Sequence, residues 1–182
     1  MRLRRFLGLL AIVGGCFDLP VRADMPALRA PVPVDTPQAR TRLFTAVDLA
    51  GAFPGAQQKL GAEEFIHVEG PDGWWRYFAT SQGLSIGSTF MARESSKAAG
   101  LTFDMLARES SLPGSQDWSS RVHLGQQCHA VYLSSAQGPM LLLQVRVGSH
   151  VLDLRTLGFA YGSPQQIVDI VEPWVRRSSV AE

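Results

Sequence analysis

The sequence predicts an α+β fold, with a single antiparallel sheet of about six or seven strands and helices packed on it in an αβα sandwich-like arrangement. Three observations predict this class. A tight β-hairpin lies at 140–157, three alternating segments lie at 63–92, and segments with helical periodicity lie at 97–109 and after Ser163. Strands joined by short turns pair antiparallel, and helices then cover the faces of the sheet.

The hairpin at 140–157 is the best defined of these elements. Its alternating runs MLLLQVRV and HVLDLRTL are joined by Gly148-Ser149, a pair typical of a two-residue type II′ turn. Such a turn fixes the register, so one face carries successive apolar pairs. The other face pairs Gln144 with Asp153 and is predicted to be a mostly polar surface.

The remaining elements follow from caps, turns and periodicity. A Ser or Thr before an apolar helical stripe predicts a helix start, and clusters of Gly, Pro and Ser separate strands. In chain order, the predicted elements are a helix at 46–53 ended by Pro54-Gly55, strands at 63–69, 74–80 and 84–92, a helix at 97–109 capped by Ser96, a loop at 110–120, strands at 121–124 and 128–134, the hairpin, and a helix from Ser163 that Pro173 kinks or ends.

The N-terminus predicts export. Three arginines precede an apolar run at 6–17 that is too short to span a bilayer, and Val21-Arg22-Ala23 follows as a cleavage site. Residues 1–23 are therefore predicted to be a signal peptide. Residues 24–42 carry four prolines and predict a Pro-rich flexible arm. The single α+β domain is predicted at 43–177, with a C-terminal tail at 178–182.

A second cleavage remains open. Val13-Gly14-Gly15-Cys16 resembles a bacterial lipobox, in which Cys16 becomes the lipidated first residue of the mature chain. Pro20 favours cleavage after Ala23 instead, because a helix-breaking residue is typical of the region before that site. Both cleavages leave Cys128 without an intramolecular thiol partner.

Charge and hydropathy limit the partners that we expect. Cleavage after Ala23 removes four arginines and Asp18, so the formal charge changes from +1 to about −2. This chain has no basic surface for nucleic acid or for an anionic membrane. No later apolar run predicts a transmembrane helix, so membrane contact is expected only through a lipid anchor at Cys16. We expect a periplasmic or cell-envelope protein without a cofactor, whose partner is a protein or a small ligand.

The strongest candidate for a binding surface is the aromatic run Trp74-Trp75-Arg76-Tyr77-Phe78. Aromatic side chains and Arg are concentrated at interfaces because each buries a large area. Trp118, in a neighbouring predicted loop, is added to this surface. The alternative interpretation is that both faces of this strand are covered and that its aromatic side chains belong to the core.

A catalytic alternative comes from Gly83-Leu84-Ser85-Ile86-Gly87, which matches the G-x-S-x-G motif of serine hydrolases. Ser85 lies inside an alternating segment that no helix follows directly, which favours a chance match. The four histidines show no metal-ligand spacing, so no metal site is predicted.

Four segments carry a resemblance to a known class. FTAVDLAGAF, VHLGQQCHAVY, LLLQVRVGSHVLDL and SPQQIVDIVEPWV, in this order, resemble small bacterial exported lipoprotein-type domains of the PsbP-like αβα sandwich class over most of 43–177. The resemblance implies a role in assembly, sensing or binding, and it supplies no catalytic residues. We therefore expect a non-catalytic exported binding or assembly domain of the cell envelope, with a small serine hydrolase using Ser85 as the alternative.

Overall fold

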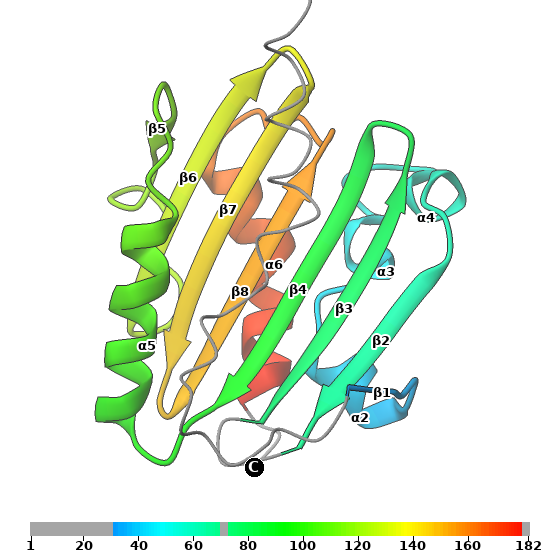
Figure 1. Cartoon of the computed structure of the whole chain (residues 1–182). Helices are drawn as coiled ribbons and strands as arrows, with labels where there is room; N and C mark the ends of the chain where they lie inside the picture. Colours follow the sequence, from blue (N-terminus) through cyan, green and yellow to red (C-terminus); the bar gives the residue numbers. More distant parts are fainter. Residues whose placement is uncertain (1–30, 70–72, 180–182) are drawn as a thin grey trace, which may run out of the picture.

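The computed structural model describes residues 31–69 and 73–179 (Figure 1). Within these ranges the chain forms one eight-stranded antiparallel sheet and five helices. The strand order across the sheet is β1-β2-β3-β4-β8-β7-β6-β5. The predicted signal peptide and Cys16 lie outside the described residues.

The strands are β1 (Val32–Pro33), β2 (Glu63–Val68), β3 (Trp74–Ser81), β4 (Leu84–Ala92), β5 (Gln116–Asp117), β6 (Gln127–Ser135), β7 (Gly138–Val147) and β8 (His150–Leu157). The helices are α2 (Pro37–Arg42), α3 (Ala46–Leu49), α4 (Ala56–Lys59), α5 (Ser96–Glu109) and α6 (Pro164–Ser179). The sheet combines two meanders, β2 to β4 and β6 to β8. They are joined because β8 pairs with β4.

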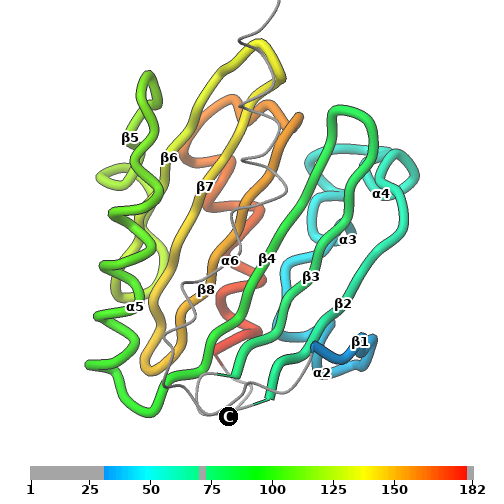
Figure 2. Tube along the Cα trace, in the orientation of Figure 1, coloured from blue at the N-terminus to red at the C-terminus, as the bar shows by residue number. Residues whose placement is uncertain are grey.

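Helices lie on both faces of the sheet, but they cover them unequally (Figures 1 and 2). One face, called here the core face, packs against α6 and the short helices α2, α3 and α4. The opposite face, called the α5 face, is covered by α5 over β7 and β8. Of the described helices, none lies over β2, β3 and β4 on the α5 face (Figure 2). The described helices therefore enclose only part of the second face of the sheet.

The α+β class agrees with the sequence, but the predicted number of six or seven strands is wrong. Both edges carry an additional strand of two residues, β1 and β5, and residues 121–124 form no strand. β1 and β5 come from segments predicted as an arm and a loop. A strand this short has no alternating pattern to detect, and pairing to β2 and β6 alone defines it.

The predicted flexible arm also differs from the structure where its residues are described. Residues 37–42 form α2, because Thr36 accepts a hydrogen bond from the backbone N–H of Ala39 and Pro37 begins the helix. Ala39 is buried in the core. At the other end of the domain, α6 extends to Ser179, so residues 178 and 179 belong to the helix and not to a tail.

Helix α6 continues through Pro173, where the sequence predicted a kink or an end. Val171, Trp174 and Val175 on either side of this proline are buried in the core. Packing on both sides of Pro173 stabilises the helix there, which offsets the backbone hydrogen bond that proline cannot donate.

The hairpin of β7 and β8 has the predicted register, with Gln144 opposite Asp153. Gly148 has a φ of 56°, and Ser149 does not have a positive φ, since glycines alone have one among the described residues. A type II′ turn requires this combination, a positive φ at its first central residue only. The predicted polar surface is not a surface, however. Gln144 and Asp153 are 0% and 3% exposed because α5 packs over β7 and β8.

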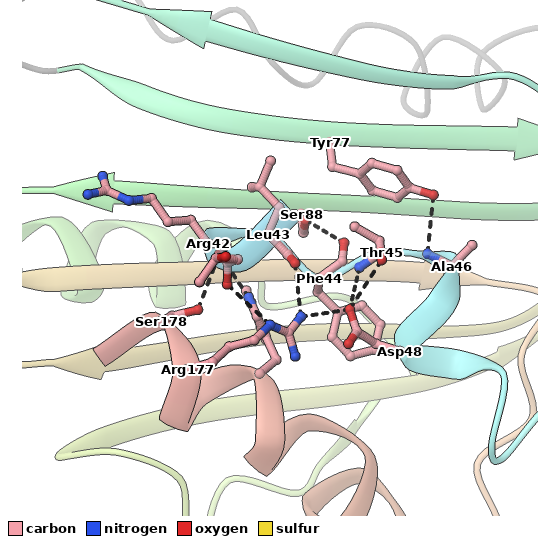
Figure 3. A network of polar contacts seen from close by, with 12 residues as sticks. Arg42, Leu43, Phe44, Thr45, Ala46, Asp48, Tyr77, Ser88, Arg177 and Ser178 are labelled. Carbon is pink, nitrogen blue, oxygen red and sulfur yellow. Dashed lines mark hydrogen bonds and ion pairs between the residues drawn. The ribbon is translucent and has the colours of Figure 1, made fainter. Parts of the chain in front are cut away.

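The segment between α2 and α3 runs between α6 and the core face of the sheet (Figure 3). Leu43 and Phe44 are fully buried, and the ring of Phe44 meets that of Trp174 edge to face at 5.4 Å between centroids. A buried segment outside helices and strands must pair its peptide groups by other means. Here side chains supply most of the partners.

Arg177 of α6 makes three of these contacts. Its guanidinium donates to the carbonyl oxygens of Thr41 (3.1 Å) and Leu43 (3.0 Å), and it forms an ion pair with Asp48 (2.8 Å). The same Asp48 carboxylate accepts the backbone N–H of Thr45 at 2.7 Å and completes the capping box of α3. One arginine therefore joins α6 to α3 and to the segment that precedes it.

The carbonyl groups of Arg42 and Phe44, on either side of Leu43, also accept hydrogen bonds from side chains. Trp174 Nε1 and Ser178 Oγ donate to the carbonyl oxygen of Arg42 at 2.9 and 3.2 Å. Ser88 Oγ, from the core face of β4, donates to the carbonyl oxygen of Phe44 at 2.7 Å. This contact explains why a serine that is 1% exposed stands in an otherwise apolar strand face.

We predict that Arg177→Ala lowers the free energy of unfolding by about 1–3 kcal/mol, because the carbonyl group of buried Leu43 and the partly buried Asp48 carboxylate lose their partner. The matched control is Arg176→Ala, whose residue forms an exposed pair with Glu172 at 2.8 Å. That variant should stay within about 0.5 kcal/mol of the parent protein. Urea denaturation measures both values, and equal losses for the two variants would contradict the role given to Arg177.

Candidate functional site

The aromatic run predicted as a binding surface lies in β3, where successive side chains point to opposite faces. Trp75 and Tyr77 lie on the core face and are buried. Trp74, Arg76 and Phe78 lie on the α5 face and are half-buried. The two halves of the run therefore have different surroundings.

Tyr77 and Trp75 have structural roles. The hydroxyl of Tyr77 accepts a hydrogen bond from the backbone N–H of Ala46 at 3.2 Å and donates to Glu63 Oε1 at 2.9 Å. Burial raises the pKa of this hydroxyl well above its ordinary value. Trp75 stacks on His67, with ring centroids 3.9 Å apart.

Trp118 is also part of the core and does not join the aromatic run. Its ring is 7% exposed and stacks on Tyr132 at 4.6 Å between centroids. It follows β5, at the edge of the sheet away from β3. The predicted binding surface therefore narrows to Trp74 and Arg76, with Phe78 beside them.

These side chains lie on the part of the α5 face that α5 does not cover. Strand register places residues of β2, β4 and β8 around them. We call this surface the open half, and all of its side chains are half-buried or exposed. Its residues are Glu64, Ile66, Trp74, Arg76, Phe78, Ser85, Thr89, Arg155 and Leu157. Trp74 also packs against the apolar cluster under α5, so it marks the border between the covered and the open parts.

A row of polar residues crosses the α5 face in register. His129 pairs with Gln144, Gln144 with Asp153, Asp153 with Thr89, and Thr89 with Arg76. The middle of the row is buried under α5, and its last two residues belong to the open half. Directly opposed residues on one face lie close enough to interact. The row therefore connects the buried part of this face to the open half.

Asp153 is the charged group at the middle of the row. Gln144 Nε2 donates to one carboxylate oxygen at 2.7 Å and contacts Ser110 Oγ at 3.0 Å, at the end of α5. Arg155 Nε donates to the other carboxylate oxygen at 3.1 Å. The side chain of Asp153 is 4% exposed and that of Arg155 is 29% exposed, so the pair reaches from the interior to the open half.

The electrostatics of the open half centre on Arg76. Burial is the largest influence and lowers the pKa of its guanidinium, while nearby Glu64 raises it, Arg155 lowers it and Asp153 raises it. Both arginines remain charged, because the guanidinium pKa is far above physiological pH. Two guanidinium groups thus share a partly desolvated surface lined by Trp74 and Phe78. There a carboxylate binds them more strongly than it does in bulk water.

The G-x-S-x-G match does not form a nucleophile elbow. Ser85 is inside β4, paired with Thr80 and Leu157, whereas the elbow requires a sharp turn from a strand into a helix. His150 pairs with Ala92 at the far end of β4, about 23 Å from Ser85 along the strand. The hydrolase alternative therefore lacks its geometry.

One serine does contact a histidine, in a place that the sequence did not indicate. Ser119 Oγ lies 3.1 Å from His129 Nδ1, and it accepts the backbone N–H of Ala130 at 3.0 Å. Asp117 accepts the backbone N–H of Ser119 at 2.8 Å, and its hydrogen bonds to Ser119 lower the pKa of the carboxyl. The carboxylate thus contacts the serine, whereas a catalytic triad requires it on the second nitrogen of the histidine. In the described part of the chain, no group of three or more His, Cys, Asp or Glu residues could hold a metal ion.

Comparison with known proteins does not establish a family. No family model matches the chain, and no curated protein matches it. A solved structure, the extracellular domain of PknH from Mycobacterium tuberculosis, has 11% sequence identity and a TM-score of 0.30 over 83% of this chain and 84% of that chain. A TM-score of 0.30 is too low to establish a common fold, so the similarity carries no conclusion about this chain.

Membrane association through Cys16 concerns a residue outside the described part of the chain. Among the helices that the structure does describe, none combines the length and the apolar character that crossing a bilayer requires.

Cys128 provides a test of reactivity in the folded domain. Burial raises the pKa of its thiol to about 12, and a backbone hydrogen bond from Leu124 offsets only part of this effect. At pH 8 roughly one thiol in ten thousand is then ionised, against about a quarter of unperturbed thiols. We predict that iodoacetamide at pH 8 modifies Cys128 at least about a hundredfold more slowly in the native protein than in concentrated urea. Comparable rates in both, measured by mass spectrometry, would show that the thiol is accessible and reactive.

Proposed function

We propose that this chain is an exported, non-catalytic binding domain of the bacterial cell envelope, and that it contacts a protein or a small ligand through the open half of the sheet. The observation that carries the proposal is the group of half-buried side chains around Trp74, Arg76 and Phe78, over which none of the described helices lies.

The composition of the open half supports a binding role. Trp and Arg are enriched among the residues that dominate interface energetics, because Trp buries a large area and Arg can donate several hydrogen bonds. Phe78 and Ile66 add apolar area on adjacent strands. A group of partly exposed apolar side chains on one part of a sheet face is typical of an interaction site.

Two observations support a role without catalysis. Ser85 lies within a strand, far from the histidine that pairs along β4. Asp117, Ser119 and His129 are arranged for structural hydrogen bonds and not for proton transfer along a triad. The resemblance of the element order to PsbP-like domains favours the same conclusion.

Export is supported by the N-terminal sequence alone. The arginines before the apolar run at 6–17, and Val21-Arg22-Ala23 after it, are typical of a secretory signal. The lipobox-like segment ending at Cys16 would instead leave the domain attached to a membrane through acyl chains.

We predict that the mature protein from the envelope fraction of its native host begins at Asp24. The measurement is its intact mass. A mass that corresponds to residues 16–182 with added acyl chains would instead show that the protein is a membrane-anchored lipoprotein. A full-length chain that begins at Met1 and is recovered in the cytoplasm would contradict export.

We also predict that a photo-crosslinking residue in the open half captures a partner or ligand in the native envelope. Phe78→p-benzoylphenylalanine should give adducts on irradiation, because Phe78 lies at the centre of the proposed surface. The matched control replaces the exposed Gln165 of α6, which lies on the opposite side of the sheet. Adducts are identified by mass spectrometry. Absence of adducts at Phe78, or equal adducts at both positions, would reject the open half as the binding surface.

A further inference from the structure

Two buried polar atoms on the α5 face belong to directly opposed residues of β6 and β7. They are Nε2 of His129 and the amide oxygen Oε1 of Gln144, and neither has a hydrogen-bond partner among the described residues. Buried polar groups are nearly always paired, because an unpaired one has lost its hydrogen bond to water. Directly opposed side chains on one face are close enough to interact, so each atom is the natural partner of the other.

The contacts of Gln144 leave Oε1 as the atom for His129. The amide nitrogen Nε2 of Gln144 donates to Asp153 Oδ1 at 2.7 Å and to Ser110 Oγ at 3.0 Å. An ionised carboxylate accepts hydrogen bonds and donates none, so the nitrogen end of the amide has to face Asp153. Oε1 only accepts, and the donor on the opposed residue is the His129 ring.

Ser119 fixes the orientation of the His129 ring. Ser119 Oγ lies 3.1 Å from Nδ1 and accepts the backbone N–H of Ala130 at 3.0 Å, on the side of β6 where β5 lies (Figure 1). The two nitrogens of an imidazole point away from each other. With Nδ1 at Ser119, Nε2 is directed away from β5, and β7 with Gln144 lies on that side.

These contacts determine which nitrogen carries the hydrogen of the neutral ring. A hydrogen on Nε2 can be donated to Gln144 Oε1, whereas a hydrogen on Nδ1 would leave two acceptors opposite each other. With its hydrogen on Nε2, the ring accepts the hydroxyl hydrogen of Ser119 at Nδ1. In this tautomer every donor of the row points the same way, from Ser119 through His129 and Gln144 to Asp153.

A second proton on the ring is accommodated by one rotation of the Ser119 hydroxyl. Nδ1–H then donates to Ser119 Oγ, so the hydroxyl hydrogen needs a different acceptor. Asp117 is that acceptor, because it already accepts the backbone N–H of Ser119 at 2.8 Å. A hydrogen bond from the Ser119 side chain is the largest cause that lowers the pKa of the Asp117 carboxyl, and the charge of His129 lowers it too. The carboxylate therefore also offsets the charge of the ring.

The other charged or titratable side chains around His129 either have partners or are exposed. Those with partners are Arg146, which donates to Gln127, and Asp153, which accepts from Gln144 and Arg155. The exposed ones, at the end of α5 and in the loop after Ser119, are Arg108, Glu109, Arg121 and His123. Asp117 is thus the charged group that a hydroxyl connects to the ring.

We infer that Asp117, Ser119 and His129 form a proton-binding site that holds β5 on β6 in two hydrogen-bonded states. The neutral ring accepts from Ser119 and donates through Nε2 to Gln144. The charged ring donates to both, and the Ser119 hydroxyl hydrogen turns to Asp117. One proton from solvent is taken up at Nδ1, and no other covalent bond forms or breaks. This device is independent of the proposed binding surface.

The tautomer is the first test, because it is measured in the unmodified mature protein. At about pH 8, where histidine is ordinarily neutral, the nitrogen chemical shifts of the His129 ring should show hydrogen on Nε2 and none on Nδ1. The ring signals are assigned by their loss in His129→Gln. Hydrogen on Nδ1 of the neutral ring would overturn the inference.

The second test follows Asp117 while the ring takes up its proton. Between about pH 8 and about pH 5, the carboxyl carbon signal of Asp117 should move together with the ring signals, because the Ser119 hydroxyl turns to the carboxylate. In Ser119→Ala that movement should be at least about threefold smaller, since only the charge of the ring remains. The matched control is Ser115→Ala, which removes a hydroxyl that donates to the carbonyl oxygen of Leu112 and should leave the movement as in the parent protein.

The amide signals of residues 116–119 report whether β5 stays paired. They should remain dispersed at about pH 5, since both states hold Ser119 on His129. Loss of this dispersion, or equal movement of the Asp117 signal in the parent protein and in a folded Ser119→Ala, would overturn the inference. Circular dichroism establishes folding. If Ser119→Ala does not fold, the tautomer and the amide signals of the parent protein decide the inference.

Discussion

The fold depends on the pairing of buried peptide groups in the segment between α2 and α3. This segment lies between α6 and the sheet, where water cannot pair its carbonyl groups, and each unpaired group costs about 1–3 kcal/mol. Arg177 of α6 pairs the carbonyl group of Leu43, and Ser88 of β4 pairs that of Phe44. Trp174 and Ser178 of α6 pair the carbonyl group of Arg42, at the end of α2 just before the segment. The same contacts attach α6 to the sheet. They account for the polar side chains found in an apolar core.

The α5 face depends on a second buried polar group. Covering β7 and β8 with α5 removes Asp153 from water, so its carboxylate requires Gln144 and Arg155 as partners. Arg155 in turn extends into the open half, where it lies near Arg76. One ion pair therefore serves the interior under α5 and also sets the charge of the candidate site. Any displacement of α5 is expected to alter both.

Sequence reasoning identified part of the candidate site. The run at 74–78 was predicted as a binding surface, and within it Trp74 and Arg76 lie on the opposite face from Trp75 and Tyr77, because side chains on a strand alternate between faces. Sequence reasoning could not tell which face is covered, since that depends on where α5 and α6 lie. Arg155, close to Arg76 on the open half, was not predicted at all. The sequence did predict that Gln144 lies opposite Asp153 in the hairpin, but it predicted that this pair is on the surface, whereas α5 buries it.

The sequence by itself determined the elements whose signals are local. Gly148-Ser149 fixed the register of β7 and β8, and alternation located β2, β3 and β4, because turn geometry and side-chain period act over a few residues. Only the tertiary structure decided that β8 lies beside β4, that β1 and β5 complete the edges and that α2 forms among the prolines. It also decided that none of the described helices covers β2, β3 and β4 on the α5 face. Those features arise from burial between residues distant in the chain, which no local pattern records.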